Sequence, residues 1–478
     1  MSSKKRPVGR TTSLPRAGLV LAALAVVAAA AAGLFFRREG ASIPDPDTSG
    51  MEPQVAERIR EVRAEVSGNP REAELWGKLG RVLQAHELYR EAAESYAEAS
   101  RRNGFDFRWA YLRARSLKEI QELELALEAI GTAKAAVTSY APLHILEAEL
   151  HEQLGRTEPT IASYRKALEI DGRCAAAELG LGRLELERGN LEESLWHLER
   201  ASELQPDSGG IQAALARARQ RAGKRGEARA AAELARALHP EVVLEDPVMA
   251  GVSEEAVSLV GYQKRAAEAE AKGQRERAEA LLRKTIEIRP EEADLHYNLG
   301  NFLARHEKGR EAERAYRRTI EVDPEHVPAL INLGIVLSGR RELPEAEALF
   351  RKALDVSPRH PGALASLAKI AALQGDAAAA IRNFERALAE DPAQSETHYA
   401  LAQVLRREGR LPEALRSFQR ALELAPDRAD IHIETAVICA SLGDYGSAWR
   451  HVQRARQIGL EPPGDFLAAL SSRMPEPH

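Results

Sequence analysis

The chain has 478 residues, of which 29% are charged and only 5% aromatic, and its formal net charge is −5 at pH 7. This length exceeds one ordinary hydrophobic core, and the slight negative charge lacks the basic field that nucleic-acid binding requires. The two cysteines, Cys174 and Cys439, lie in different halves of the chain, which argues against a disulfide framework or a thiolate metal site. We expect both to be small buried residues.

Residues 17–36 form an uncharged apolar run, AGLVLAALAVVAAAAAGLFF. As a helix this run would be about 30 Å long, the thickness of a bilayer core. The tail 1–16 carries five basic residues and only Arg37 and Arg38 follow the run, so the positive-inside rule places the amino terminus in the cytoplasm. We therefore predict a single-pass inner (cytoplasmic) membrane protein with its remainder in the periplasm. The alternative is a cleaved signal sequence.

Two elements are expected next. Residues 37–52 are rich in Gly, Ser, Pro and Asp, which predicts a flexible tether. Residues 53–67 follow with a helical pattern and are expected to cap the elements after them.

From Ala73 onward, small residues recur at fixed places of a 34-residue frame that fits eleven times. The eighth position holds Gly80, Ala114, Ala148, Gly182, Ala216, Ala266, Gly300, Gly334, Ala368, Ala402 and Ala436. The twentieth and twenty-seventh positions hold Ala, Ser or Thr in every unit. The twenty-fourth often holds an aromatic residue, and the thirty-second is often proline. A fixed period of this length predicts two packed helices per unit, with small residues where the backbones approach.

The pattern resembles the tetratricopeptide repeat. The first unit carries Trp76, Leu79, Gly80, Ala92, Tyr96 and Ala99 at the places of that family's motif, with Leu83 where the family has Tyr and Gly104 where it has Pro. The resemblance spans about residues 53–462. It implies an all-α fold, a right-handed superhelix (α-solenoid) of about eleven helix-turn-helix repeats. The apolar run 17–36 places this superhelix behind an N-terminal transmembrane helix.

The frame slips once, between units five and six. Residues 53–242 hold the capping helix and units one to five, residues 259–462 hold units six to eleven, and residues 463–478 form a C-terminal cap and tail. The insertion between them, 243–258, reads VLEDPVMAGVSEEAVS. Asp246-Pro247 predicts a turn, and Ser253 before two glutamates resembles a helix start. The insertion is either a passive bulge or a hinge between two arms.

We find no catalytic signature. The His-Glu pairs lack the second histidine of a zinc protease, and no phosphate-binding loop or nucleophile elbow occurs. The chain is expected to be no enzyme and to use no cofactor and no metal.

The resemblance implies that the second, fifth, sixth, ninth and twelfth positions of each unit line a concave groove. In the first half the ninth position gives a basic column, Arg81, Arg115, Arg183 and Arg217, suited to carboxylates or paired with acids of adjacent units. In the second half Asn298 and Asn332 share the sixth position, as in the asparagine ladder of the O-GlcNAc transferase superhelix, which grips peptide backbones. The other expected groove residues are Tyr297, Asn301, Ile331, Ile335, Tyr399, Gln403 and Arg406.

The resulting hypothesis is a non-catalytic, membrane-tethered scaffold that holds a peptide or helix of partner proteins and assembles an envelope complex. Its expected partners are proteins or peptides and the membrane, with no nucleic acid and no small-molecule substrate. Two alternatives stay open: an exported soluble adaptor, and the substrate-recognition subunit of an enzyme such as a glycosyltransferase. The short segment 463–478 disfavours the last, because it leaves no room for a catalytic domain.

Overall fold

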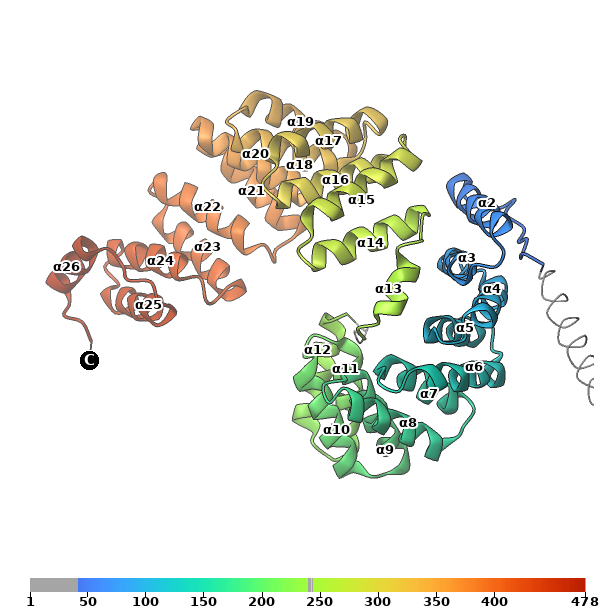
Figure 1. Cartoon of the computed structure of the whole chain (residues 1–478). Helices are drawn as coiled ribbons and strands as arrows, with labels where there is room; N and C mark the ends of the chain where they lie inside the picture. The colour runs from blue at the N-terminus through green and yellow to red at the C-terminus, as the bar shows by residue number, and fades with distance from the viewer. Residues whose placement is uncertain (1–41, 240–241, 243, 478) are drawn as a thin grey trace, which may run out of the picture. The chain divides into compact units, whose positions relative to one another are not determined.

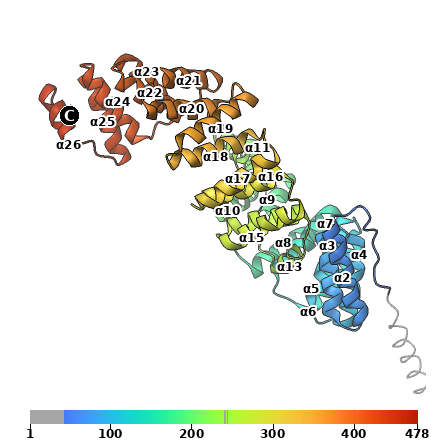
Figure 2. The same ribbon diagram turned by 90° about the horizontal axis from the view of Figure 1, so that it is seen from above.

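The computed structural model describes residues 42–477 except 240, 241 and 243. The chain forms two compact units, one ending at Gly261 and the other beginning at Tyr262. The described residues contain 25 α-helices and no β-strand, apart from one isolated bridge between Ser208 and His239. Consecutive helices lie side by side from residue 53 to 237 in the first unit and from residue 275 to 458 in the second (Figures 1 and 2). The predicted all-α solenoid is therefore confirmed.

The first unit consists of paired helices behind a single leading helix. Its helices are α2 (Pro53–Gly68), α3 (Ala73–Ala85), α4 (Tyr89–Arg102), α5 (Phe107–Glu119), α6 (Leu123–Ala136), α7 (Ala141–Gln153), α8 (Thr157–Ile170), α9 (Ala175–Arg188), α10 (Leu191–Leu204), α11 (Gly209–Arg221), α12 (Arg225–Ala237) and α13 (Pro247–Ser253). Helix α2 buries Val55, Ile59, Val62 and Val66 and packs on α3.

The second unit continues the pairs and ends in one further helix. Its helices are α14 (Leu259–Ala271), which begins in the last residues of the first unit, α15 (Arg275–Ile288), α16 (Ala293–Arg305), α17 (Gly309–Val322), α18 (Val327–Gly339), α19 (Leu343–Val356), α20 (Pro361–Gln374), α21 (Ala377–Glu390), α22 (Ser395–Arg407), α23 (Leu411–Leu424), α24 (Ala429–Ser441), α25 (Tyr445–Ile458) and α26 (Gly464–Arg473). The indole of Trp449 on α25 donates to the carbonyl of Met474, 3.0 Å away, just after α26.

The small-residue columns lie where the helices approach most closely. All residues of the eighth, twentieth and twenty-seventh positions are buried, except Ala235. A Cβ added at Gly334 would lie 2.6 Å from the Phe350 ring, and one at Gly300 would lie 2.6 Å from the Tyr316 ring. The eighth position of a unit therefore packs directly against its twenty-fourth, which is why small and aromatic residues recur together. Cys174 and Cys439 are both buried, as expected.

A further column, which the sequence analysis missed, lies between the two helices of each unit. The fifteenth position has positive φ in all eleven units. Glycine fills it in seven of them, from Gly155 (φ 68°) to Gly443 (φ 82°), because glycine has no Cβ to clash in the left-handed conformation. The other four units carry Glu87, Gln121, Glu307 and Arg341 there, with φ between 60° and 65°.

The membrane prediction is not supported. Among the described residues, no helix combines the length and the apolar character needed to cross a bilayer. The predicted localisation, a single-pass inner-membrane protein, is therefore corrected. The apolar run 17–36 and the tail 1–16 lie outside the described residues.

The segment after this run also differs from its expectation where it is described. Residues 42–52 were predicted to form part of a flexible tether. Instead Pro44 and Pro46 are buried, and Asp45 forms an ion pair with Arg63 of α2 at 2.6 Å. Proline loses little conformational freedom on ordering, so a short segment can pack with few contacts.

The insertion forms a helix at a different place from the one expected. Asp246 caps α13 by accepting from the backbone N–H of Met249 at 3.0 Å, and Pro247 is the first helical residue. Ser253, expected to start a helix, is the last residue of α13. The Asp-Pro pair was thus the helix start, since an Asp cap followed by Pro favours the first turn.

Candidate functional site

The residues predicted to line the groove of the second unit fall into two groups. Tyr297, Asn298 and Asn301 lie on α16, and Ile331, Asn332 and Ile335 lie on α18. Tyr399, Gln403 and Arg406 lie together on α22, with α20 packed between α18 and α22. The structure therefore brings the first six together and leaves the last three as a separate patch.

A polar network joins α16, α17 and α18. The Asn332 amide donates to Oδ1 of Asn301 at 2.9 Å and to the hydroxyl of Tyr297 at 3.4 Å. The hydroxyl of Tyr316 on α17 donates to the same Asn301 oxygen at 2.9 Å. These bonds fix Asn301 and Asn332 in place, so the network is a preorganised polar surface.

Apolar and unpaired polar groups border this network. Ile335 is 53% exposed, whereas Ile331 is buried. The Asn298 side chain is exposed, and its amide has no hydrogen-bond partner among the residues described. A hollow of about 280 Å³ lies beside them, lined by Asn301, Ala304, Arg305, Tyr316, Asn332, Ile335 and Val336. An exposed aliphatic side chain next to fixed amides suits an extended peptide, whose backbone needs both donors and acceptors.

The α22 patch is largely engaged by its own neighbours. Gln403 donates to the hydroxyl of Tyr399 at 2.8 Å, and the guanidinium of Arg428 lies 5.6 Å from the Tyr399 ring centroid. Arg406 lies 3.6 Å from Glu434 of α24. This patch offers fewer free groups than the surface on α16 and α18.

The four arginines of the basic column have four different environments. Arg81 contacts Glu74 at 3.2 Å on its own helix and lies 5.5 Å from the Trp109 ring. Arg183 lies 3.8 Å from Glu152 of the preceding unit. Arg217 is exposed and borders a hollow of about 780 Å³ between α11 and α12.

Arg115 faces the insertion. Its guanidinium lies 3.7 Å from the Asp246 carboxylate and 3.3 Å from the Tyr111 hydroxyl. Tyr111 and Tyr140 donate their hydroxyls to the two oxygens of Asp246, each at 2.5 Å. Burial raises the pKa of both phenols, with the Asp246 carboxylate contributing, so both stay protonated donors at neutral pH. Sequence reasoning missed this cluster, although Tyr111 occupies the fifth, groove-facing position of its unit.

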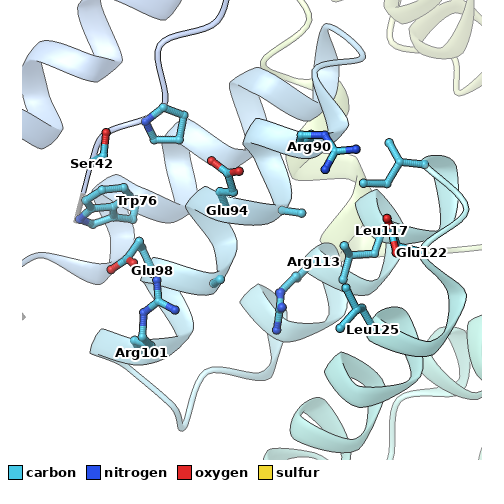
Figure 3. Close-up of a pocket in the computed structure, with 14 residues that line it drawn as sticks. Ser42, Trp76, Arg90, Glu94, Glu98, Arg101, Arg113, Leu117, Glu122 and Leu125 are labelled. Atoms are coloured by element: carbon cyan, nitrogen blue, oxygen red, sulfur yellow. Dashed lines mark ion pairs between the residues drawn. The ribbon is translucent and has the colours of Figure 1, made fainter.

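A separate cavity of about 360 Å³ lies among α4, α5 and α6 (Figure 3). Trp76 and Ser42 border one end, and Leu117 and Leu125 border the other. Its charged lining is partly paired, because Glu98 contacts both Arg101 and Arg102. We assign no binding role to this cavity.

Comparisons with known proteins agree with the helical repeat. Models described as the tetratricopeptide repeat match residues 78–141, 145–209 and 371–432. A model described as the cilia and flagella-associated protein 70 middle TPR-like domain matches residues 262–373. These stretches fall on the helix pairs of both units and support a tetratricopeptide-repeat protein, a class whose members generally act as interaction scaffolds.

Solved structures are similar at low identity. YrrB, described as a TPR protein with an unusual peptide-binding site, is 24% identical, covers 40% of this chain and 98% of its own, and gives a TM-score of 0.33. The pilF protein of Pseudomonas aeruginosa is 20% identical, with coverages of 45% and 99% and a TM-score of 0.40. Yeast Tom70 is 14% identical, with coverages of 84% and 94% and a TM-score of 0.36. Such scores carry no functional argument. No curated protein matches the chain.

Proposed function

We propose that the chain is a non-catalytic interaction scaffold that binds an extended peptide of a partner protein on the surface formed by α16 and α18. The observation that carries this proposal is the exposed Ile335 beside the fixed amides of Asn301 and Asn332. Ile335 provides apolar contact, and the exposed Asn298 amide is free to pair with a peptide bond. The match to a TPR-like domain at 262–373 supports a protein or peptide as the partner.

A peptide selected on the chain itself tests this proposal. Twelve-residue peptides would be selected by display on the full-length protein, and the strongest would be synthesised with a fluorescent label for affinity measurement. We expect Ile335→Asp to weaken its binding about tenfold or more, because a charge replaces an apolar contact of roughly 1.5–3 kcal/mol. Val356→Asp is the matched control, since Val356 is also exposed (40%) but lies at the end of α19, the second helix of the same unit.

The two variants must be compared at equal thermal stability. Loss of affinity in Ile335→Asp with full affinity in Val356→Asp supports the surface on α16 and α18. Equal affinity of both variants and the unchanged protein would refute it. Failure of the selection to give any peptide that binds better than its scrambled sequence would refute it as well.

A further inference from the structure

The insertion lies against the helices that carry the expected groove positions of the first unit. Helix α13 packs against α3 and α5, on the inner side of the arc that α3, α5 and α7 form (Figure 1). It meets groove-facing positions of the frame: Gln84 is a twelfth-position residue, and Tyr111 and Arg115 are fifth- and ninth-position residues. These are the positions that a bound partner would contact.

One carboxylate anchors the insertion. Asp246 receives hydrogen bonds from Tyr111, Tyr140 and its own helix N-terminus, and Arg115 lies nearby. Its side chain is only 8% exposed. A carboxylate that accepts several hydrogen bonds is held more strongly and more specifically than a neutral group of the same size.

Apolar contacts and a second ion pair complete the fit. Val252 is 4% exposed and belongs to the hydrophobic core of the first unit, and Val248, Met249 and Val257 pack against that core. Gln84 donates to the Met249 sulfur at 3.9 Å. Beyond α13, Glu255 forms an ion pair with Arg58 of α2 at 2.8 Å.

The insertion is held as a peptide ligand would be held. Helix α13 has seven residues, too few to be stable by itself, so its order depends on the groove. It lies outside the 34-residue frame. Its covalent attachment only raises its local concentration at the groove.

We propose that the groove of α3, α5 and α7 is a binding site for a partner protein segment in which an aspartate caps a short, apolar, proline-led helix, and that residues 244–258 cover this site in the same chain. The hydroxyls of Tyr111 and Tyr140 and the Arg115 guanidinium recognise the carboxylate, and the core around Val252 recognises the aliphatic side chains. A partner segment binds by displacing the insertion. This site is independent of the surface on α16 and α18.

The insertion itself supplies the probe. A fluorescein-labelled peptide of residues 244–258, LEDPVMAGVSEEAVS, would be titrated into the full-length protein and into an opened variant, Asp246→Ala with Val252→Asp. These changes weaken the contacts between the covering segment and the groove, and they leave the groove residues unchanged. We expect the opened variant to bind the peptide at least about tenfold more tightly, because the competing segment no longer occupies the site.

Three controls identify the contacts. Glu245→Ala removes the neighbouring, exposed carboxylate and should leave peptide binding as weak as in the unchanged protein. Tyr111→Phe with Tyr140→Phe, added to the opened variant, should remove most of the gained affinity. A peptide with Asn in place of Asp246 should bind the opened variant at least about fivefold more weakly, because the charge-assisted bonds are lost.

Each remaining outcome overturns the proposal. A folded opened variant that binds the peptide no better than the unchanged protein shows that the groove is not a transferable site. If the opened variant and the milder Asp246→Asn both lose helical circular dichroism, the insertion is a required part of the core and no partner can displace it. Binding that survives the paired Tyr→Phe changes places the peptide elsewhere.

Discussion

Gly334 offers the sharpest test of how the repeat packs. A Cβ at this position would lie 2.6 Å and 2.7 Å from two ring atoms of Phe350, closer than real side chains approach. Phe350 is 1% exposed, so its ring cannot swing into solvent. Gly334→Leu should therefore cost about 1–3 kcal/mol of overpacking. This outweighs the roughly 1 kcal/mol that replacing a helical glycine gains.

Gly339 provides a matched control on the same helix. It is the last residue of α18, and no atom would lie within 4 Å of a Cβ there. Gly339→Leu should therefore be neutral or stabilising by up to about 1 kcal/mol. Urea unfolding followed by circular dichroism measures the difference in the free energy of unfolding between the variants. Hydrogen exchange shows which helices are destabilised. The packing argument fails if Gly334→Leu is as stable as Gly339→Leu, or if exchange within α18 and α19 is unchanged.

Three further outcomes are expected. Asn332→Ala should lower stability by about 0.5–1.5 kcal/mol in urea unfolding because its amide bridges α18 to α16, whereas Asn298→Ala should change it little. Burial, with smaller contributions from His432 and Arg450, lowers the pKa of His451 to about 4. His451 of the unfolded chain binds a proton at a higher pH than His451 of the folded protein, so stability should fall as the pH drops from about 6.5 towards 4. Thermal melts should show a smaller fall for His451→Gln. Arg341→Gly should raise the melting temperature, by about 0.5–1 kcal/mol of stability, because Arg341 has φ 65°.

The repeat could be predicted because packing repeats with the frame. The pairing of Gly334 with Phe350 and of Gly300 with Tyr316 follows from two columns sixteen positions apart. The same regularity does not predict how the side-chain contacts differ between units. Asn298 and Asn332 share a frame position, yet only Asn332 is hydrogen-bonded. Asn301 of the preceding unit accepts from Asn332, whereas the equivalent residue before Asn298 is Ala267, which has no side-chain acceptor.

The location of the insertion could not be predicted from the frame. Residues outside a repeat have no repeating partner, so their contacts depend on particular side chains. Asp246 lies 135 positions from Tyr111 and 106 from Tyr140, and no local pattern connects them. The available signals were a groove-facing tyrosine at position 111 and an Asp-Pro pair that starts a helix, and each is weak by itself.

Specificity in this chain therefore follows from departures from the repeat. A uniform stack of helix pairs presents the same backbone in every unit, and only changes at groove-facing positions distinguish one stretch from another. Two stretches stand out: the amide network around Asn301, and the tyrosine pair that holds Asp246. In the second stretch, residues 244–258 of the same chain occupy the groove. The side chains of this segment indicate the chemistry that the groove accepts. A partner without a carboxylate would leave the part-buried hydroxyls of Tyr111 and Tyr140 without that acceptor, so that groove should discriminate against it.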